Sequence, residues 1–321
     1  MSNIIITNVG RRGYLVEYIK EIKSFIGKVF VSDCDATASG LYGNNDGRFI
    51  LPRPVDNEEL YVQELTKLCK AQQIGIVIPV IDPEIFILSK YRAQMLKEGI
   101  NVIVSDKRVL DICYDKLQMN EFLSSNGFLV ANTYTNLDSF TQALNEAKIQ
   151  FPVIVKPVYG SGSVETSIVD NLDKVKSLFH EGLMIQEVLT GTEYGCDVFN
   201  TFEKEPVRCV VKKKISMRSG ETDKSITVDN KELQQVGIEL GKKLGHIGNL
   251  DFDVFETEEG PYIIDINPRF GGGYPATHVA GCNHLDLLIR MCNGEKIKPD
   301  FDSYKKGLLV MKVINVVMHQ L

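Results

Sequence analysis

The residues that constrain this chain most run Asn249-Leu250-Asp251-Phe252-Asp253-Val254-Phe255 and, after a short turn, Tyr262-Ile263-Ile264-Asp265-Ile266-Asn267-Pro268-Arg269. Acidic or amide residues alternate with apolar ones in both runs, and a period of two is typical of a β-strand. The two runs and the turn between them therefore predict a β-hairpin.

Polar side chains two residues apart on a strand lie on the same face of a sheet. Asp251 and Asp253 in the first run, with Asp265 and Asn267 in the second, are therefore candidates for four converging oxygen ligands. Magnesium prefers oxygen ligands and takes only a few from protein, with the remainder from water and phosphates. Arg269 follows directly and is a candidate for clamping a phosphoryl group during transfer.

An exposed hairpin with a solvated acidic face shows the same alternation. The second run, however, has Asn267 in place of a further acid and continues into Pro268-Arg269 and Gly271-Gly272-Gly273. Those residues are harder to explain as ordinary surface, so the metal-binding interpretation is favoured.

A lysine and a glycine-rich loop form a second cluster. Phe151-Pro152-Val153-Ile154-Val155-Lys156-Pro157 predicts a short strand that ends in a cation, and Val158-Tyr159-Gly160-Ser161-Gly162-Ser163 follows at once. Glycine and serine let backbone N–H groups approach phosphate oxygens, and lysine adds a point charge. A plain turn after a strand has the same composition, so the residues alone leave both interpretations open.

The first third of the chain alternates strands with helices. We expect strands at 4–7, 28–32, 76–80 and 101–104, and helices at 14–22, 57–71 and 84–97. This alternation implies parallel pairing through right-handed crossovers. Residues 1–106 are therefore predicted to form a small doubly wound α/β domain.

The pattern changes after residue 106. A helix is predicted over 107–124, followed by mixed strands and helices whose alternation suits an antiparallel sheet covered on one face. The overall class is α/β and α+β, with domains expected at 1–106, 107–190 and 191–321. The sequence has no repeat and no low-complexity linker, so the domains are expected to pack closely.

Composition excludes several classes of protein. A net charge of −6 disfavours a nucleic-acid binder, and Lys212-Lys213-Lys214 is too short a run to reverse that. No apolar run is long enough to cross a bilayer, and residues 1–10 lack the features of a secretory signal, so a cytoplasmic location is expected.

Cysteine and histidine add no second site. The seven cysteines have no C-x-x-C spacing, so they are interpreted as buried thiols. His246, His278 and His284 have neither triad nor metal spacing, and we interpret them as packing residues or substrate contacts.

Taken in order, these residues resemble the ATP-grasp superfamily, in particular short proteins similar to the large chain of carbamoyl phosphate synthase. The resemblance covers nearly the whole chain. It rests on a helix lysine, a strand lysine with its loop, a hinge glutamate, an acid, and an acid-x-Asn pair. The matching positions are Lys116, Lys156, Glu187, Asp251, and Asp265 with Asn267.

The resemblance implies a nucleotide site. Gln186, Glu187 and Val188 lie in the strand that offers backbone groups to adenine in the family, and Glu193 resembles the ribose-binding glutamate. A simple core strand remains the alternative for this segment. Lys116, Lys156 and the loop Gly160, Ser161, Gly162 and Ser163 would hold the phosphates, although Gly-Ser-Gly-Ser departs from the family pattern. Asp253 competes with Asp251 as the first metal ligand, and alignment favours Asp251.

The resemblance also implies an activity: an ATP-dependent ligase that joins a carboxylate to an amine through an acyl phosphate and releases ADP and phosphate. Magnesium is the expected metal, with manganese as a substitute, and Arg269 is the expected catalytic residue. The expected partners are small carboxylates and amines, with neither nucleic acid nor membrane, and a homodimer stays open.

Acceptor specificity is expected in the loops at 10–13, 33–40, 82–84, 218–224 and 271–278. Arg11, Arg12 and Arg218 are candidates for holding a carboxylate or phosphate of the substrate, although a single arginine is more often a solvated surface cation.

Three rival functions remain. A Rossmann oxidoreductase would need G-x-G-x-x-G, but Gly10-Arg11-Arg12-Gly13 is only G-x-x-G, although Asp33 suits a ribose partner. A non-catalytic nucleotide-binding protein would have no need of Asp265, Asn267 and Arg269. Synthesis of carbamoyl phosphate is less favoured because the synthase has two ATP-grasp halves and an ammonia source.

Overall fold

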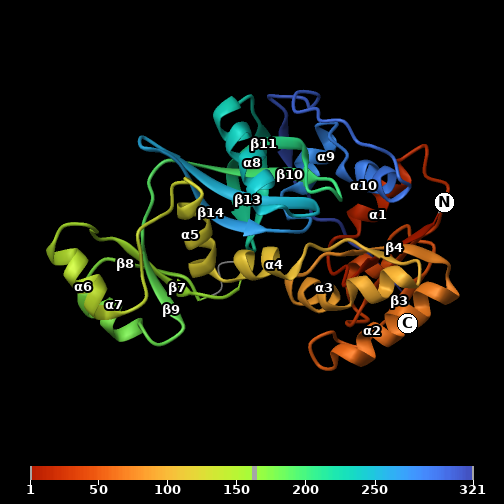
Figure 1. The fold of residues 1–321 in the computed structure, drawn as a ribbon, viewed down its shortest axis with the longest axis horizontal. Coiled ribbons are helices and arrows are strands. Elements are labelled where there is room, and N and C mark those ends of the chain that lie inside the picture. Colours follow the sequence, from red (N-terminus) through yellow and green to blue (C-terminus); the bar gives the residue numbers. More distant parts are fainter. Residues whose placement is uncertain (1, 161–164, 320–321) are drawn as a thin grey trace.

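A computed structural model describes residues 2–160 and 165–319 and contains three sheets (Figure 1). An N-terminal five-stranded sheet lies at one end, a four-stranded sheet at the other, and a six-stranded sheet between them. In the described part of the chain no helix is long and apolar enough to cross a bilayer.

The N-terminal sheet is parallel, with the order β3-β2-β1-β4-β5. Its strands are β1 (Asn3–Thr7), β2 (Val29–Asp33), β3 (Arg48–Ile50), β4 (Ile74–Pro79) and β5 (Asn101–Val102). Its helices are α1 (Tyr14–Lys20), η1 (Ser39–Tyr42), α2 (Glu58–Ala71) and α3 (Asp82–Lys97). The strand β3 was not expected, because a run of three residues is too short to establish a period of two.

Alternate residues of β1 explain why helices cover both faces of this sheet. Ile4 and Ile6 pack in one core with α1, whereas Ile5 packs in another with α2 and α3. The prediction of a doubly wound N-terminal sheet is therefore confirmed.

One helix was predicted wrongly. The expected helix over 107–124 is two helices, α4 (Lys107–Tyr114) and α5 (Lys116–Ser125). Asp115 lies between them with an extended backbone, and its carboxylate accepts hydrogen bonds from the N–H groups of Leu117 (2.9 Å) and Gln118 (3.1 Å). An aspartate that caps a new helix start competes with continuation of the first helix. Lys116 is consequently the first residue of α5.

The four-stranded sheet has the order β6-β9-β7-β8. Its strands are β6 (Thr133–Tyr134), β7 (Val153–Pro157), β8 (Ser167–Val169) and β9 (Leu183–Glu187), and its helices are α6 (Leu137–Asn145) and α7 (Leu172–Leu178). Phe140 of α6 and Val175 of α7 pack with Val153 and Ile185 in a separate small core. The other face of this sheet is turned toward the molecule's centre (Figure 1).

The six-stranded sheet is antiparallel, as expected, with the order β14-β13-β10-β11-β12-β15. Its strands are β10 (Thr192–Asn200), β11 (Pro206–Arg218), β12 (Glu221–Thr227), β13 (Gly248–Thr257), β14 (Gly260–Asn267) and β15 (Leu309–Met311). The helices of this part are α8 (Lys231–Leu244), α9 (Tyr274–Val279) and α10 (His284–Cys292). Leu233 and Leu240 of α8 pack on one face against Val198 and Phe252.

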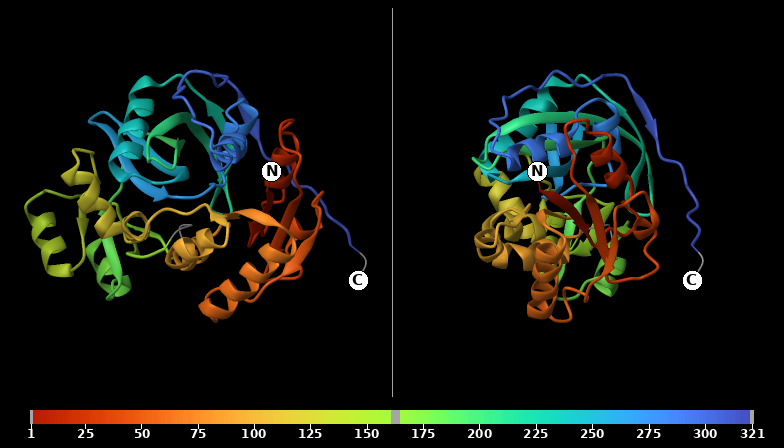
Figure 2. Two further views of the ribbon diagram at one scale, coloured as in Figure 1. Left: turned by 45° about the vertical axis from the view of Figure 1, so that its right-hand side comes forward. Right: turned by 90° about the vertical axis from the view of Figure 1, so that its right-hand side faces the viewer.

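The N-terminal sheet and the six-stranded sheet share a hydrophobic core. Leu15 and Ile19 of α1 pack in one cluster with Tyr274 of α9 and Leu288 of α10. The chain after β15 extends back past the N-terminal sheet (Figure 2), where His319 Nε2 lies 3.1 Å from the Arg48 guanidinium. Close packing of these parts was expected, whereas the domain limits at 106 and 190 stay a prediction.

The capping role of Asp115 can be tested. Asp115→Ala removes the acceptor for two N–H groups and is expected to lower the free energy of unfolding by about 1 kcal/mol. Asp115→Asn keeps the acceptor and should lie near wild type. Urea unfolding followed by circular dichroism measures both, and equal losses in the two variants would contradict the assignment.

Candidate functional site

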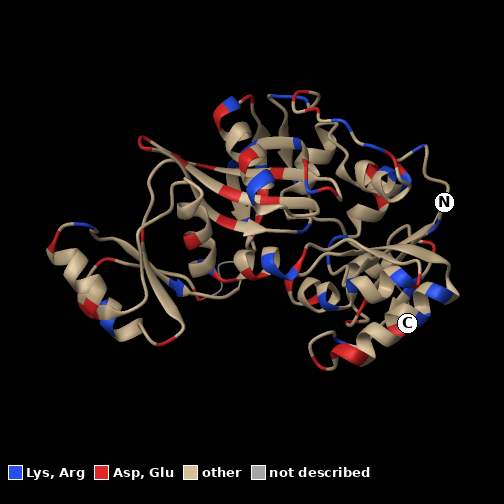
Figure 3. Cartoon of the chain, viewed as in Figure 1, with Lys and Arg blue, Asp and Glu red and all other residues tan. Residues whose placement is uncertain are grey.

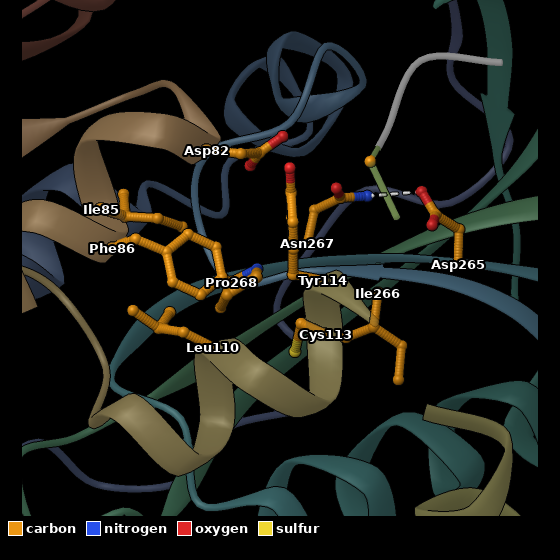
Figure 4. Close-up of a pocket in the computed structure, with 11 residues that line it drawn as sticks. Asp82, Ile85, Phe86, Leu110, Cys113, Tyr114, Asp265, Ile266, Asn267 and Pro268 are labelled. Carbon is orange, nitrogen blue, oxygen red and sulfur yellow. Dashed lines mark hydrogen bonds between the residues drawn. The ribbon is translucent and has the colours of Figure 1, made fainter. Parts of the chain in front are cut away.

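The hairpin of β13 and β14 places the four predicted metal-ligand candidates in two opposed pairs. Asp251 is directly opposite Asn267, and Asp253 is directly opposite Asp265. Directly opposed residues of an antiparallel pair share a face, so all four side chains lie on the same side. The Asn267 amide nitrogen donates to an Asp265 carboxylate oxygen at 2.8 Å (Figure 4).

Arg269 closes this group from the end of β14. Its Nε donates to Asp82 Oδ1 at 3.1 Å, its NH2 donates to Asn267 Oδ1 at 3.1 Å, and its NH1 lies 3.8 Å from Asp251 Oδ2. Asp82 is the first residue of α3, one of the helices that cover the N-terminal sheet. The guanidinium therefore joins two parts of the molecule at the site.

Lys214 of β11 is a site residue that the sequence reasoning missed. Its Nζ lies 2.8 Å from Glu193 Oε1 and 2.7 Å from Asp253 Oδ1, and its side chain is only 5% exposed. Gly195 lies directly opposite Asp253, and a Cβ there would be 3.3 Å from Lys214 Cε. Because Gly195 has no side chain, the Lys214 side chain can pass over it and reach Asp253.

The electrostatics of this group follow from burial and proximity. Burial raises the pKa of Asp253 to about 7 although Lys214 lowers it. Burial, followed by the Asp197 carboxylate, raises the pKa of Asp251. For Lys214, burial alone would lower the pKa, but Asp253 and Glu193 raise it above its ordinary value.

The three consecutive lysines have different surroundings. Lys213 is exposed, whereas Lys212 is buried and ion-paired with Asp197, and Lys214 points to the acidic hairpin. Strand alternation could have separated Lys213 from its two neighbours, since residues i and i+2 share a face. The sequence analysis considered Lys212, Lys213 and Lys214 only as one short basic run. Acidic and basic residues lie side by side on these central strands (Figure 3).

A cleft of about 300 Å³ opens in front of these residues. Its walls come from the hairpin, from Arg12 and residues 80–83 of the N-terminal part of the chain, and from the turn between β11 and β12. The charged residues that line it are Arg12, Asp82, Lys214, Glu221, Asp251, Asp253, Asp265 and Arg269.

Two glycines are needed for the shape of this cleft. A Cβ on Gly271 would lie 2.1 Å from Asp251 Oδ2, and one on Gly272 would lie 2.8 Å from the Glu221 side chain. Arg12, from the first glycine turn, donates to the Val80 carbonyl and lies 3.6 Å from Glu221.

The two predicted phosphate-binding lysines come from other elements: Lys116 begins α5, and Lys156 lies on β7 of the four-stranded sheet. Lys116 donates to the Gly160 carbonyl, and Gly160 lines a small cavity of about 10 Å³ with Asp265 and Asn267. Burial, followed by the charge of Lys116, lowers the pKa of Lys156 to about 8. Ser161, Gly162 and Ser163 lie outside the described residues.

The predicted adenine segment forms β9 and the residue after it. Gln186 is buried and donates to Thr133 Oγ1 at 2.8 Å, while Glu187 accepts from the Asn132 backbone N–H at 2.6 Å. Val188 is half-buried just beyond the strand. The segment is therefore a strand between two neighbours, and the adenine role remains a prediction.

Other candidates lie away from the hairpin. Arg218 is largely exposed beside Asp223 at 3.5 Å, and Arg11 is exposed. His278 stacks on Tyr18 with ring centroids 3.6 Å apart. His246 and His284 are buried, in line with packing roles.

The donor set suits a hard cation that takes few protein ligands. Among residues 2–160 and 165–319, no three His, Cys, Asp or Glu side chains converge as in a site built from protein alone. Magnesium usually binds through one or two carboxylates plus phosphates and waters. Asp251, Asp265 and Asn267 offer such oxygens, whereas Asp253 is engaged by Lys214.

Two family models match the chain. The model described as "PylC-like, N-terminal domain" matches residues 4–103, and the model described as "ATP-grasp domain" matches residues 113–273, just over half of the chain. A curated relative, carbamoyl-phosphate synthase of Methanobrevibacter smithii, is 26% identical over 78% of this chain and 70% of its own.

Solved structures share the fold. The biotin carboxylase domain of Hydrogenobacter thermophilus 2-oxoglutarate carboxylase, in complex with MgADP, ADP and bicarbonate, has a TM-score of 0.72 at 16% identity and covers 96% of this chain and 73% of its own. N5-carboxyaminoimidazole synthetase of Staphylococcus aureus has a TM-score of 0.70 at 15% identity and covers 92% and 78%.

The ion pairs of Lys214 give a prediction about stability and pH. A carboxyl whose pKa is higher in the folded than in the unfolded state makes the fold less stable as pH rises from the ordinary value through the folded value. Lys214→Met removes the cation that holds the pKa of Asp253 down. Its loss in thermal midpoint relative to wild type is therefore expected to grow from pH 6 to pH 8.

Lys213→Met is the matched control, because Lys213 is exposed and adjacent; it should stay near wild type at every pH. Adding Asp253→Asn to Lys214→Met should remove most of the pH dependence. A loss that is the same at pH 6 and pH 8 would contradict the coupling.

Proposed function

The chain belongs to the ATP-grasp family, and on that premise we propose that it uses ATP to join a carboxylate to an amine through an acyl phosphate. The membership itself confirms the predicted family, fold and enzyme class. The substrates and the roles of individual residues are the content of the proposal.

One observation carries it. Asp251, Asp265, Asn267 and Arg269 all line a single cleft whose opposite wall comes from the N-terminal part of the chain, from Arg12 and residues 80–83. Phosphoryl transfer needs metal-binding oxygens, a cation for the transferred group, and a second substrate held in line. This cleft offers donors for the first two and about 300 Å³ for the third.

We place ATP between the four-stranded and six-stranded sheets. Its adenine would lie at Gln186, Glu187 and Val188, and its ribose at Glu193, whose carboxylate is already held by Lys214. Lys116, Lys156 and Gly160, with the loop after it, would hold the phosphates. Lys116 and Lys156 are close enough for the charge of Lys116 to lower the pKa of Lys156, and two neighbouring cations suit a polyanion.

Asp251, Asp265 and Asn267 would hold magnesium. We favour Asp251 over Asp253 because the Asp253 carboxylate is already ion-paired with Lys214. Bound magnesium would neutralise charge on the phosphate oxygens. Manganese suits the same oxygen donors and is a candidate substitute.

In the proposed reaction, a substrate carboxylate oxygen attacks the terminal phosphorus of ATP, the bond to the bridging oxygen breaks, and ADP leaves. Arg269 would stabilise the charge of the transferred group, and Arg12 would orient the carboxylate from the N-terminal side. The neutral amine then attacks the acyl carbon, inorganic phosphate leaves, and the nitrogen loses a proton. No side-chain nucleophile is required.

A second candidate is carbamoyl-phosphate-type synthesis, favoured by the name of the 26% identical relative. Its first step would be the same chemistry on bicarbonate, with ammonia as the amine. Ammonia would displace phosphate to give carbamate, and a second ATP would then phosphorylate the carbamate, so this candidate releases two ADP and one phosphate per product.

The test is magnesium-dependent release of ADP and phosphate with a panel of carboxylates, including bicarbonate, each with and without amines. We expect release that requires a carboxylate and falls at least a hundredfold in Asp265→Ala. Asp138→Ala, exposed on α6, is the control and should retain activity. Formation of AMP, or no binding of ATP, would overturn the proposal.

The lowered pKa of Lys156 gives a second prediction. Lys156 is charged below about pH 8, so affinity for MgADP should be level below that pH and fall by about tenfold per pH unit above it. Lys156→Arg keeps its charge and should extend the level region upward. Titration calorimetry from pH 7 to pH 9.5 measures this, and the same decline in both proteins would exclude Lys156 as its source.

A further inference from the structure

A buried histidine touches the residue that holds the backbone of Arg269. His284 is the first residue of α10 and is fully buried, and its Nδ1 lies 2.6 Å from Asn249 Oδ1. Asn249 lies on β13, two residues before Asp251. Its Nδ2 donates to the Arg269 carbonyl oxygen at 3.1 Å and lies 3.4 Å from Asp197 Oδ1.

The chemistry of the partners sets the direction of every bond. The Arg269 carbonyl and the Asp197 carboxylate are acceptors, so the Asn249 amide must turn its NH2 group toward them. Its oxygen then faces His284, whose Nδ1 must carry a hydrogen. Burial lowers the pKa of His284 to about 3, so the ring is neutral and Nε2 carries none. In agreement, Nε2 is buried with no hydrogen-bond partner among the described residues.

A buried ion pair fixes the other end of the same turn. Lys212 and Thr277 both donate to Asp197, and Lys212 Nζ also lies 3.4 Å from the Gly273 carbonyl oxygen. The turn from Arg269 to Gly273 is therefore held at its first residue by Asn249 and at its last by Lys212.

These contacts determine where the guanidinium of Arg269 lies. The side chain spans Asp82, Asn267 and Asp251, so a shift of its backbone would move it relative to all three. Misplacement of a reacting or stabilising group by about 1 Å can cost about a hundredfold in rate.

We propose that His284 is a positioning residue for Arg269, acting through the Nδ1–H donated to Asn249. This inference rests on the function proposed for Arg269. The side chains that His284 is seen to contact, Asn249, Phe199 and Tyr274, are outside the lining of the cleft, and its Nδ1–H selects the one orientation of Asn249 in which the amide holds the Arg269 carbonyl.

The direct test uses the unmodified protein. A long-range ¹H–¹⁵N spectrum of the histidine rings, assigned by comparison with His284→Asn, is expected to show His284 as the neutral Nδ1–H tautomer. A protonated ring, or a hydrogen on Nε2, would overturn the proposal. This measurement is independent of any activity, so it stands even if the proposed reaction fails.

The kinetic test compares two variants. His284→Phe keeps a ring beside Phe199 and Tyr274 but removes the donor, whereas His284→Asn places an N–H close to the position of Nδ1. We expect kcat of the ATP-dependent reaction to fall by about tenfold to a hundredfold in His284→Phe, with KM for ATP unchanged. His284→Asn should recover most of it.

Equal losses in the two variants, or a change confined to KM, would assign His284 to packing and refute the positioning role. If His284→Phe does not fold, the ¹H–¹⁵N spectrum of the wild-type histidine rings decides whether Nδ1–H is donated to Asn249. If wild type shows no turnover, the proposed function fails while the tautomer still tests the contact.

Discussion

The site depends on placing several acidic side chains on one face of a sheet. The register of β13 and β14 sets Asp251, Asp253, Asp265 and Asn267 side by side, next to Asp197 on β10. Burial and mutual repulsion would protonate such a group. The raised pKa values of Asp251 and Asp253 express that cost, and cations must offset it for the carboxylates to stay available for a metal.

The cations come from elements that are distant in sequence. Lys212 and Lys214 come from β11, and Arg269 comes from the end of β14. Arg269 also pairs with Asp82, a carboxylate supplied by the first residue of α3 in the N-terminal part of the chain. Breaking a fully buried pair such as Asp197 with Lys212 typically costs about 3–5 kcal/mol, because the remaining charge has no partner. The shared core between α1, α9 and α10 therefore supports the electrostatics of the site as well as the fold.

Local patterns predicted much of this, and non-local contacts explain the remainder. The period of two identified the hairpin and its shared face, and alternating elements identified the parallel sheet. The break at Asp115 was missed because apolar periodicity continues through it, although an aspartate before Lys116-Leu117-Gln118 is a capping signal. Lys214 was missed because its partners Glu193 and Asp253 lie on other strands, and no local pattern records pairing between strands.

Three glycines mark positions where a charged side chain from another element approaches the backbone closely. Gly195 matters because a lysine crosses it, and Gly271 matters because Asp251 occupies the volume of its Cβ. Gly271-Gly272-Gly273 was noted as unusual for a surface, but its meaning requires knowing which side chain faces each residue. A glycine on a strand or turn beside acidic residues thus predicts that a side chain approaches closely. Its identity follows only from the register, and here the register brings charged groups: Lys214 over Gly195, Asp251 against Gly271 and Glu221 against Gly272. The glycines therefore permit the dense packing of charge on which the proposed chemistry depends.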